Sequence, residues 1–170
     1  MILYFIRHAI AEPLREGAGP EDDRQRILTA KGRKKMRDIA KGLSRLKPRI
    51  EVILASPYPR ALQTARILAK GLDLGKEKVT LTDELTPAGD AGRLISEIAA
   101  KHGAAQAVAL VGHEPSLSRL ISVLISGDPG LAIILKKGGI CRLSAEKLQY
   151  GRCATLEWLM APAQLRRIGA

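Results

Sequence analysis

The chain has 170 residues, a length that is typical of one domain and long enough to bury a hydrophobic core. Hydrophobic residues make up 46% of the sequence, which excludes a disordered chain, and aromatic residues only 3%, which disfavours base-stacking surfaces. The formal net charge of +11 at pH 7 favours anionic partners such as phosphate esters, acidic protein faces or nucleic acid. A solvated basic surface explains the same charge equally well, so both interpretations stay open.

Short apolar runs alternate with helical patterns along the chain. We expect strands at 2–6, 52–55, 79–81, 107–111, 132–135 and 154–159. The third of these is expected at a sheet edge. Helical spacing of apolar residues predicts helices between Thr29 as N-cap and Pro48, over 60–70, around 94–99 and around 117–125. We expect a loop over 13–23, which is rich in Gly, Pro and charge, and a frayed tail after Pro162.

Strands that alternate with helices predict an α/β fold, a three-layer sandwich with a mostly parallel central sheet flanked by helices. No repeat or linker is visible, so residues 1–170 are expected to form a single domain. Cys141 and Cys153 lack metal-ligand spacing and are expected as reduced thiols, with one disulfide as the alternative. No apolar run approaches the ~20 residues that span a bilayer, so we expect a cytoplasmic protein without membrane contact.

Residues that suit phosphate chemistry follow three of the predicted strands. Arg7 and His8 end the first strand, Arg60 follows the second after a short turn, and His113 follows the strand at 107–111. Ligands of open α/β sheets collect at the carboxyl ends of the strands, so these side chains are expected at one rim. A neutral imidazole can attack phosphorus and carry the group covalently, and guanidinium groups bind phosphate oxygens bidentately. Each residue taken alone also fits a structural role.

Four sequence elements in this order resemble the signatures of the histidine phosphatase (phosphoglycerate mutase-like) superfamily. Arg7-His8-Ala9 resembles its RHG signature, with alanine in place of the usual glycine. The run 28–32 (LTAKG) resembles its LTxxG element, and 56–65 (SPYPRALQTA) closely resembles its SPxxRAxQTA element. The run 111–115 (VGHEP) resembles its second-histidine motif. The ten-residue central element is the most specific of the four.

Within this superfamily the chain resembles the SixA-type branch, compact phosphohistidine phosphatases that act on histidine-phosphotransfer (HPt) domains. Ala9, the run 84–90 (ELTPAGD) and the GHEP sequence carry this narrower resemblance. It implies a phosphoglycerate mutase-like fold, no cofactor or metal, and His8 as the phospho-accepting nucleophile. It also implies a phosphate pocket that binds phosphate or sulfate and consists of Arg7, His8, Arg60 and His113.

The proton donor is the role that the resemblance leaves open. Many members of the superfamily place a carboxylic acid after the central helix, and Glu84 is the nearest candidate here, with Asp83 beside it. An alkoxide needs a well-placed acid in order to leave, whereas the imidazole of phosphohistidine leaves more readily. Glu84 is therefore either the acid or a surface carboxylate with a structural role.

The predicted function is removal of phosphate from phosphohistidine on a protein such as an HPt domain, through a phospho-His8 intermediate. One alternative is a phosphatase of small phosphomonoesters that uses the same site, and a mutase is disfavoured because the short chain has little material for a lid. A basic nucleic-acid-binding module is a further alternative, although no binding motif is visible. A third alternative is a non-catalytic relative that only binds phosphoproteins. The presence of all four residues, Arg7, His8, Arg60 and His113, argues against it.

Overall fold

A six-stranded sheet forms the centre of the computed structural model, which describes residues 1–170. The strands are β1 (Ile2–Arg7), β2 (Val52–Ala55), β3 (Val79–Leu81), β4 (Ala107–Gly112), β5 (Ile140–Ala145) and β6 (Ala154–Met160). Their order across the sheet is β3-β2-β4-β1-β5-β6. The first four strands are parallel, whereas β5 is antiparallel to both β1 and β6. The prediction of a mostly parallel sheet with an edge strand at 79–81 is confirmed.

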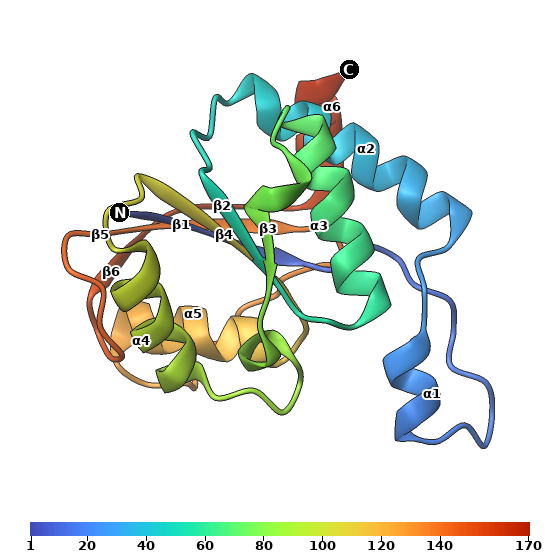
Figure 1. Cartoon of the computed structure of the whole chain (residues 1–170), viewed down its shortest axis with the longest axis horizontal. Coiled ribbons are helices and arrows are strands. Elements are labelled where there is room, and N and C mark those ends of the chain that lie inside the picture. The colour runs from blue at the N-terminus through green and yellow to red at the C-terminus, as the bar shows by residue number, and fades with distance from the viewer.

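Helices cover both faces of this sheet (Figure 1). They are α1 (Pro20–Gln25), α2 (Ala30–Arg45), α3 (Pro59–Gly71), α4 (Ala91–His102), α5 (Ser116–Ser126) and α6 (Pro162–Gly169). Two short 3₁₀ helices, η1 (Lys76–Lys78) and η2 (Asp83–Leu85), flank β3. Helices α2, α3 and α6 pack on one face and α4 and α5 on the other, while α1 projects from the carboxyl ends of the parallel strands (Figure 1). The predicted three-layer sandwich is confirmed.

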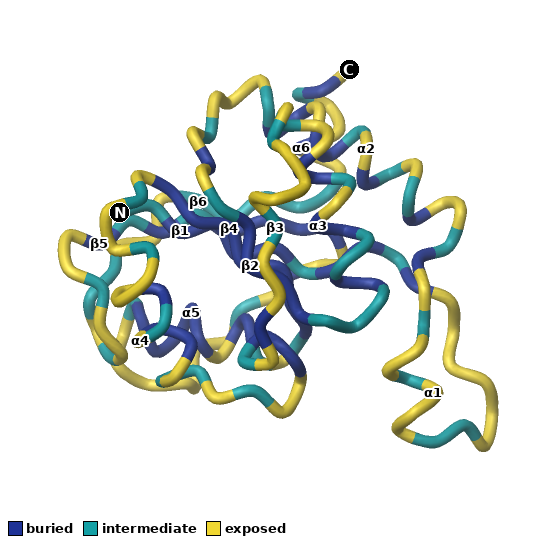
Figure 2. Tube along the Cα trace, in the orientation of Figure 1, coloured by how far each residue is buried: buried dark blue, intermediate teal, exposed yellow.

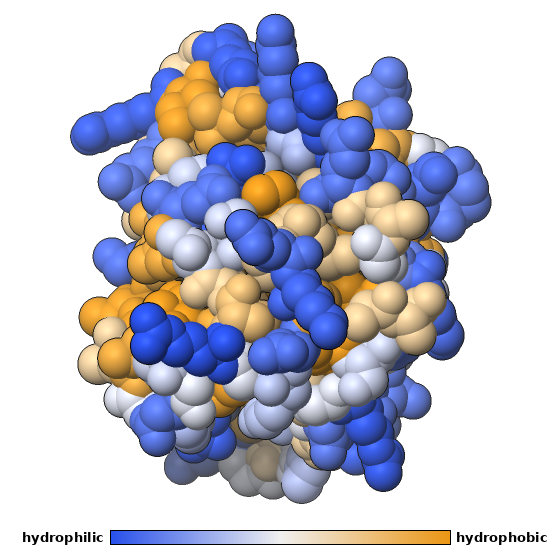
Figure 3. Space-filling model, turned by 90° about the vertical axis from the view of Figure 1, so that its left-hand side faces the viewer, coloured by the Kyte–Doolittle hydropathy of each residue, from blue (hydrophilic) through white to orange (hydrophobic).

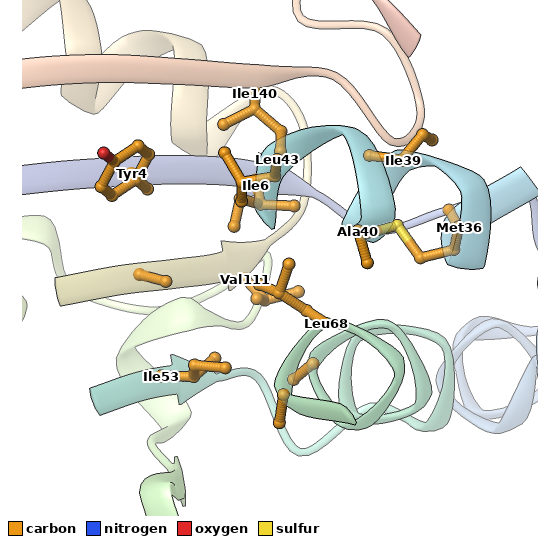
Figure 4. Packing of buried hydrophobic residues seen from close by; sticks show 14 of the residues in the cluster. Tyr4, Ile6, Met36, Ile39, Ala40, Leu43, Ile53, Leu68, Val111 and Ile140 are labelled. Carbon is orange, nitrogen blue, oxygen red and sulfur yellow. The ribbon is translucent and has the colours of Figure 1, made fainter. Parts of the chain in front are cut away.

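The two faces of the sheet bury separate hydrophobic clusters. Along β1, Tyr4 and Ile6 pack toward α2 and α3, and Leu3 and Phe5 pack toward α4 and α5. This alternation follows from the two-residue period of a strand. Figure 4 shows Ile6 and Val111 between the sheet and the helices that carry Leu43 and Leu68. Strand β4 is buried throughout and β1 is buried along its four middle residues (Figure 2), which fixes the positions of their carboxyl ends.

The LTAKG run begins α2 and joins it to the end of β1. Thr29 is the N-cap, and its hydroxyl accepts a hydrogen bond of 2.8 Å from the amide of Gly32. A Cβ atom on Gly32 would lie 2.1 Å from the carbonyl oxygen of Ile10, so only glycine permits this close approach. The amide of Leu28 donates to Oε1 of Gln63 on α3. These contacts hold the first helix of the core against the segment that carries His8.

The predicted strand at 132–135 is wrong. Residues 131–136 pair with no strand, and Ile134 there is 77% exposed. The position beside β1 is occupied instead by β5 (Ile140–Ala145), which the sequence analysis missed. The continuous apolar run at 132–135 led to the prediction, whereas Arg142 and Ser144 interrupt the apolar residues of β5. Long-range pairing, which no local pattern encodes, decided which segment became the strand.

Two further expectations, about the C-terminal tail and an N-terminal loop, are wrong, the second of them only in part. The tail after Pro162 forms α6, because Leu165 is fully buried against the other helices on its side of the sheet. The expected loop over 13–23 contains the first residues of α1, which begins at Pro20 and has no buried residue. Both cysteines are free thiols, and burial raises the pKa of Cys141 to about 12. None of the helices has the length and hydrophobicity needed to cross a membrane.

Candidate active site

The carboxyl ends of β1, β2 and β4 bring the predicted site residues together. His8 follows β1, His113 follows β4, and Arg60 is the second residue of α3, which begins shortly after β2. The two imidazole rings have centroids 5.1 Å apart. We refer to Arg7, His8, Arg60 and His113 as the strand-end cluster. Figure 3 shows the opposite end of the molecule, where hydrophilic side chains cover much of the surface between smaller hydrophobic areas.

The His8 ring is held by a backbone carbonyl. Its Nδ1 atom lies 2.8 Å from the carbonyl oxygen of Ala9, and the residue is 5% exposed. Because a carbonyl oxygen only accepts, Nδ1 carries the hydrogen. The Nε2 atom of the neutral ring therefore keeps its lone pair. The amide of Ala9 in turn donates to Oγ1 of Thr64 on α3, at 3.0 Å, so the backbone that orients the ring is itself fixed.

The second imidazole is positioned by the turn after β2. Nε2 of His113 lies 2.9 Å from the hydroxyl oxygen of Ser56, and the Tyr58 ring lies 5.1 Å from the His113 ring, centroid to centroid. His113 is 2% exposed. The guanidinium carbon of Arg60 lies 5.2 Å from the centre of the Tyr58 ring. The SPYPR sequence thus orients both a histidine and an arginine.

Both histidines are neutral at physiological pH. Burial, together with the nearby Arg60 and Arg7, lowers the pKa of His8 to about 4, even though its bond to Ala9 favours the charged form. Burial, the neighbouring His8 and the charge of Arg60 lower the pKa of His113 to about 3. A neutral His8 is the form that can act as a nucleophile.

Three buried polar atoms of the strand-end cluster have no hydrogen-bond partner within the protein: Nε of Arg7, Nε of Arg60 and Nδ1 of His113. Leaving such an atom unpaired costs about 1–3 kcal/mol, so these three atoms need polar partners, which ordered water or a polar ligand can supply. Arg7 is fixed by its Nη1 atom, which donates to the carbonyl oxygen of Leu135 at 3.0 Å. Two guanidinium groups beside a neutral imidazole suit a phosphoryl group with its negative oxygens.

Arg60 makes an ion pair that the sequence analysis missed. Its Nη2 atom lies 2.8 Å from Oδ2 of Asp23, a carboxylate within α1, and its Nη1 atom donates to the backbone carbonyl of the same residue. Arg26 pairs with the other carboxylate oxygen of Asp23. Burial alone would raise the pKa of Asp23, but its hydrogen bonds to Arg26 and Arg60 outweigh burial and lower it. Asp23 is therefore a carboxylate at neutral pH.

Further residues at the site belong to the recognised motifs without having been predicted individually as site residues. Ser56, Tyr58 and Thr64 all belong to the SPYPRALQTA run, which was the available signal for them. Lys137 lies in none of the four sequence elements, so the sequence did not mark it as a site residue. Its pKa is lowered by partial burial and by the charges of Arg7, Arg26 and Arg60, and its own charge contributes to lowering the pKa of His8. The site is therefore more cationic than the four predicted residues make it.

Glu84 lies outside the strand-end cluster. Its carboxylate accepts a hydrogen bond of 2.6 Å from the amide of Asp90, the N-cap of α4. Glu84 also lines a small hollow with Leu85 and Leu117, and no member of the strand-end cluster lines it. A larger hollow of about 430 Å³ lies within residues 12–27 and likewise contains none of the four. The structure brings together four of the five predicted site residues and places Glu84 at the start of α4.

The comparison with protein families agrees with this geometry. The family model described as the histidine phosphatase superfamily (branch 1) matches residues 3–87, half of the chain, and this stretch contains three of the four sequence elements. The chain belongs to the histidine phosphatase superfamily. Of its strand-end cluster, Arg7, His8 and Arg60 lie within the matched stretch, and His113 lies beyond it.

Individual relatives match over nearly the whole chain. An uncharacterized protein of Picosynechococcus sp. (strain ATCC 27264 / PCC 7002 / PR-6) is 37% identical over 97% of this chain and 99% of its own length. The phosphohistidine phosphatase SixA of Escherichia coli (strain K12) is 29% identical over 98% of this chain and 97% of its own length. The structure of the protein histidine phosphatase SixA complexed with tungstate superposes with a TM-score of 0.80 at 27% identity, covering 97% and 99% of the two chains. The chain is thus a SixA-like member of the superfamily.

Proposed function

We propose that this histidine phosphatase is a phosphohistidine phosphatase that works through a phospho-His8 intermediate without a metal ion. The observation that carries the proposal is the 2.8 Å hydrogen bond from Nδ1 of His8 to the Ala9 carbonyl. This bond fixes the tautomer whose Nε2 is nucleophilic, in a ring that burial keeps neutral. The similarity to SixA proteins supports the choice of phosphohistidine as the substrate class.

In the first step, Nε2 of His8 forms a bond to phosphorus while the bond from phosphorus to the substrate imidazole breaks. The electron pair of that bond returns to the leaving nitrogen. Arg7 and Arg60, whose Nε atoms lack partners, stabilise the charge on the transferring oxygens. In the second step, water attacks phosphorus, the bond to His8 breaks, and inorganic phosphate leaves.

The position of Glu84 favours a substrate with a good leaving group. Its carboxylate accepts from the amide of Asp90, and the hydrogen-bond partners of His8 and His113 are the Ala9 carbonyl and the Ser56 hydroxyl, neither of which is a carboxylate. Asp23 is held in its charged form by Arg26 and Arg60, which makes it a poor proton donor. An imidazole that is protonated on its other nitrogen can leave without a dedicated acid, whereas an alkoxide cannot. We infer that a phosphohistidine on a protein such as an HPt domain is the substrate.

The test is parallel turnover of a phosphorylated HPt domain and a panel of small phosphate esters, without added metal. The wild-type chain is compared with His8→Ala and with the matched control His102→Ala, which removes the histidine at the end of α4. We expect fast loss of phosphohistidine and slow ester cleavage by wild type and His102→Ala. For His8→Ala we expect a loss on the order of 10⁴-fold or more and no trapped phosphoenzyme.

Other results would change the assignment. Fast cleavage of one small ester would assign the chain as a small-molecule phosphomonoester phosphatase that uses the same site. Retention of phosphohistidine turnover by His8→Ala would contradict the covalent intermediate. Dependence of turnover on an added metal ion would contradict the proposed metal-independent chemistry.

A further inference from the structure

The segment that carries Asp23 is attached to the rest of the protein in an unusual way. Residues 12–27, which we call the α1 segment, leave the end of β1 and return to the start of α2 (Figure 1). Its two ends are joined by a bridge between Ala11 and Leu28 and by a 2.9 Å hydrogen bond from the amide of Glu12 to the carbonyl of Ile27. The part in between is exposed or half-buried throughout (Figure 2).

One side-chain contact ties α1 to the body of the protein. All hydrogen bonds and ion pairs of residues 20–25 stay within residues 19–26, apart from those between Asp23 and Arg60. The helix contributes no buried residue, so apolar packing does not anchor it. The Asp23–Arg60 pair therefore fixes the position of α1 relative to the body of the protein.

The same arginine belongs to the strand-end cluster. Both terminal nitrogens of Arg60 contact Asp23, and only Nε is left without a partner. The Arg60 side chain is 3% exposed and the Asp23 side chain 30%, so the carboxylate is the partner with room to move. The carboxylate of Asp23 occupies Nη2 of Arg60, and its backbone carbonyl occupies Nη1. A phosphoryl group that uses these terminal nitrogens competes with the carboxylate, because both anions need the same donors and repel each other.

We propose that Asp23 is a competitive latch: it occupies Arg60 in the free protein, and an arriving phosphate displaces it and releases α1 from the body. This inference rests on the proposed function in one respect, the role of Arg60 in binding phosphate. The latch lowers the apparent affinity for phosphate by the fraction of molecules in which Arg60 is occupied. It also links the occupancy of the site to the position of an exposed helix at its rim.

The test is direct binding of inorganic phosphate and of tungstate, measured by calorimetry, to wild type, Asp23→Asn and Asp22→Asn. Asp22 is the matched control because it loses the same charge one residue away, and its carboxylate accepts from the amide of Gly19 instead of from Arg60. We expect Asp23→Asn to bind both anions about tenfold more tightly than wild type, and Asp22→Asn to stay within about twofold of wild type. Hydrogen exchange of wild type should speed up in residues 19–26 when phosphate is added.

Each remaining outcome overturns the latch in a distinguishable way. Equal or weaker phosphate binding by Asp23→Asn, with wild type binding normally, would show that Asp23 positions Arg60 and does not compete, and the proposed phosphatase function would stand. Equal tightening in Asp23→Asn and Asp22→Asn would reduce the effect to net charge. Absence of phosphate and tungstate binding in all three proteins would overturn both the latch and the phosphate pocket. Unchanged or slower exchange in 19–26 would contradict release of α1.

Discussion

The strand-end cluster and the α1 segment meet at the Asp23–Arg60 ion pair but are built in opposite ways. His8, Arg60 and His113 are each 5% exposed or less and stand at the ends of buried strands or at the start of a core helix. Helix α1 buries none of its residues and is tied down through one ion pair. Groups that must be held within a fraction of an ångström need the rigid support of the sheet. A group that must give way to the substrate needs weak attachment.

The largest expected contrast between the two regions is in turnover. Arg60→Ala should lower kcat for phosphohistidine about 10²–10³-fold, because it removes a donor to the transferring oxygens. Arg24→Ala in α1 should change kcat by about twofold or less, because Arg24 is exposed and pairs only with Glu21. Steady-state kinetics of the two variants checks the contrast. Similar losses in both would show that the α1 segment takes part in the chemistry.

The two histidines of the strand-end cluster should make the folding stability of the protein sensitive to acid. The folded-state pKa of His8, about 4, lies below its unfolded value of 6.5, and that of His113, about 3, lies lower still. Between these values the unfolded chain binds protons that the native protein does not, so stability falls as the pH drops below 6.5. The decline should level off near pH 4 for His8 and near pH 3 for His113. The contribution of His8 to this loss of unfolding free energy is on the order of 3 kcal/mol.

Denaturant unfolding between pH 7 and pH 4 checks this effect. The double variant His8→Asn, His113→Asn should lose less stability over that range than wild type, since neither asparagine titrates. Equal pH slopes in the two proteins would show that the histidines are less perturbed than their burial indicates.

Replacing one glycine by alanine in the core and one in the α1 segment should show how tightly each region is packed. Gly32→Ala should destabilise the protein by about 1–3 kcal/mol, because its Cβ would lie 2.1 Å from the carbonyl oxygen of Ile10. Gly19→Ala should cost at most about 0.5 kcal/mol, because the nearest atom to its Cβ would be 3.9 Å away and its φ of −87° suits alanine. Thermal unfolding of both variants measures the difference. A large cost at Gly19 would mean that α1 is more firmly packed than its exposure indicates.

The smallest expected effect concerns Glu84, which belongs to neither region. Glu84→Gln should leave turnover of alkyl phosphates and of phosphohistidine within about twofold of wild type, because the Glu84 carboxylate accepts from the amide of Asp90 and lies outside the strand-end cluster. Measuring kcat for both substrates with one enzyme preparation checks this expectation. A loss confined to alkyl phosphates would contradict it and assign Glu84 as the acid that an alkoxide leaving group needs.

The motifs of this chain predicted most of the site because each motif combines chemistry with local geometry. The RHA sequence places His8 just after β1, and GHEP places His113 just after β4. Parallel strands end at one edge of a sheet, so strand ends with the right residues had to meet there. The local hydrophobic pattern gave a wrong prediction where pairing between distant strands decides which segment joins the sheet. The apolar run at 132–135 stayed outside the sheet, and β5 took its position beside β1.

The sequence by itself determined the α/β class, the positions of four parallel strands and the gathering of Arg7, His8, Arg60 and His113, since these depend on local periodicity and motif spacing. Only the tertiary structure decided that Asp23 pairs with Arg60 across 37 residues of sequence and that the carboxylate of Glu84 binds the start of α4. The reason is physical. Long side chains at a rim choose their partners by distance in space, and that distance exists only after the sheet and its helices have packed.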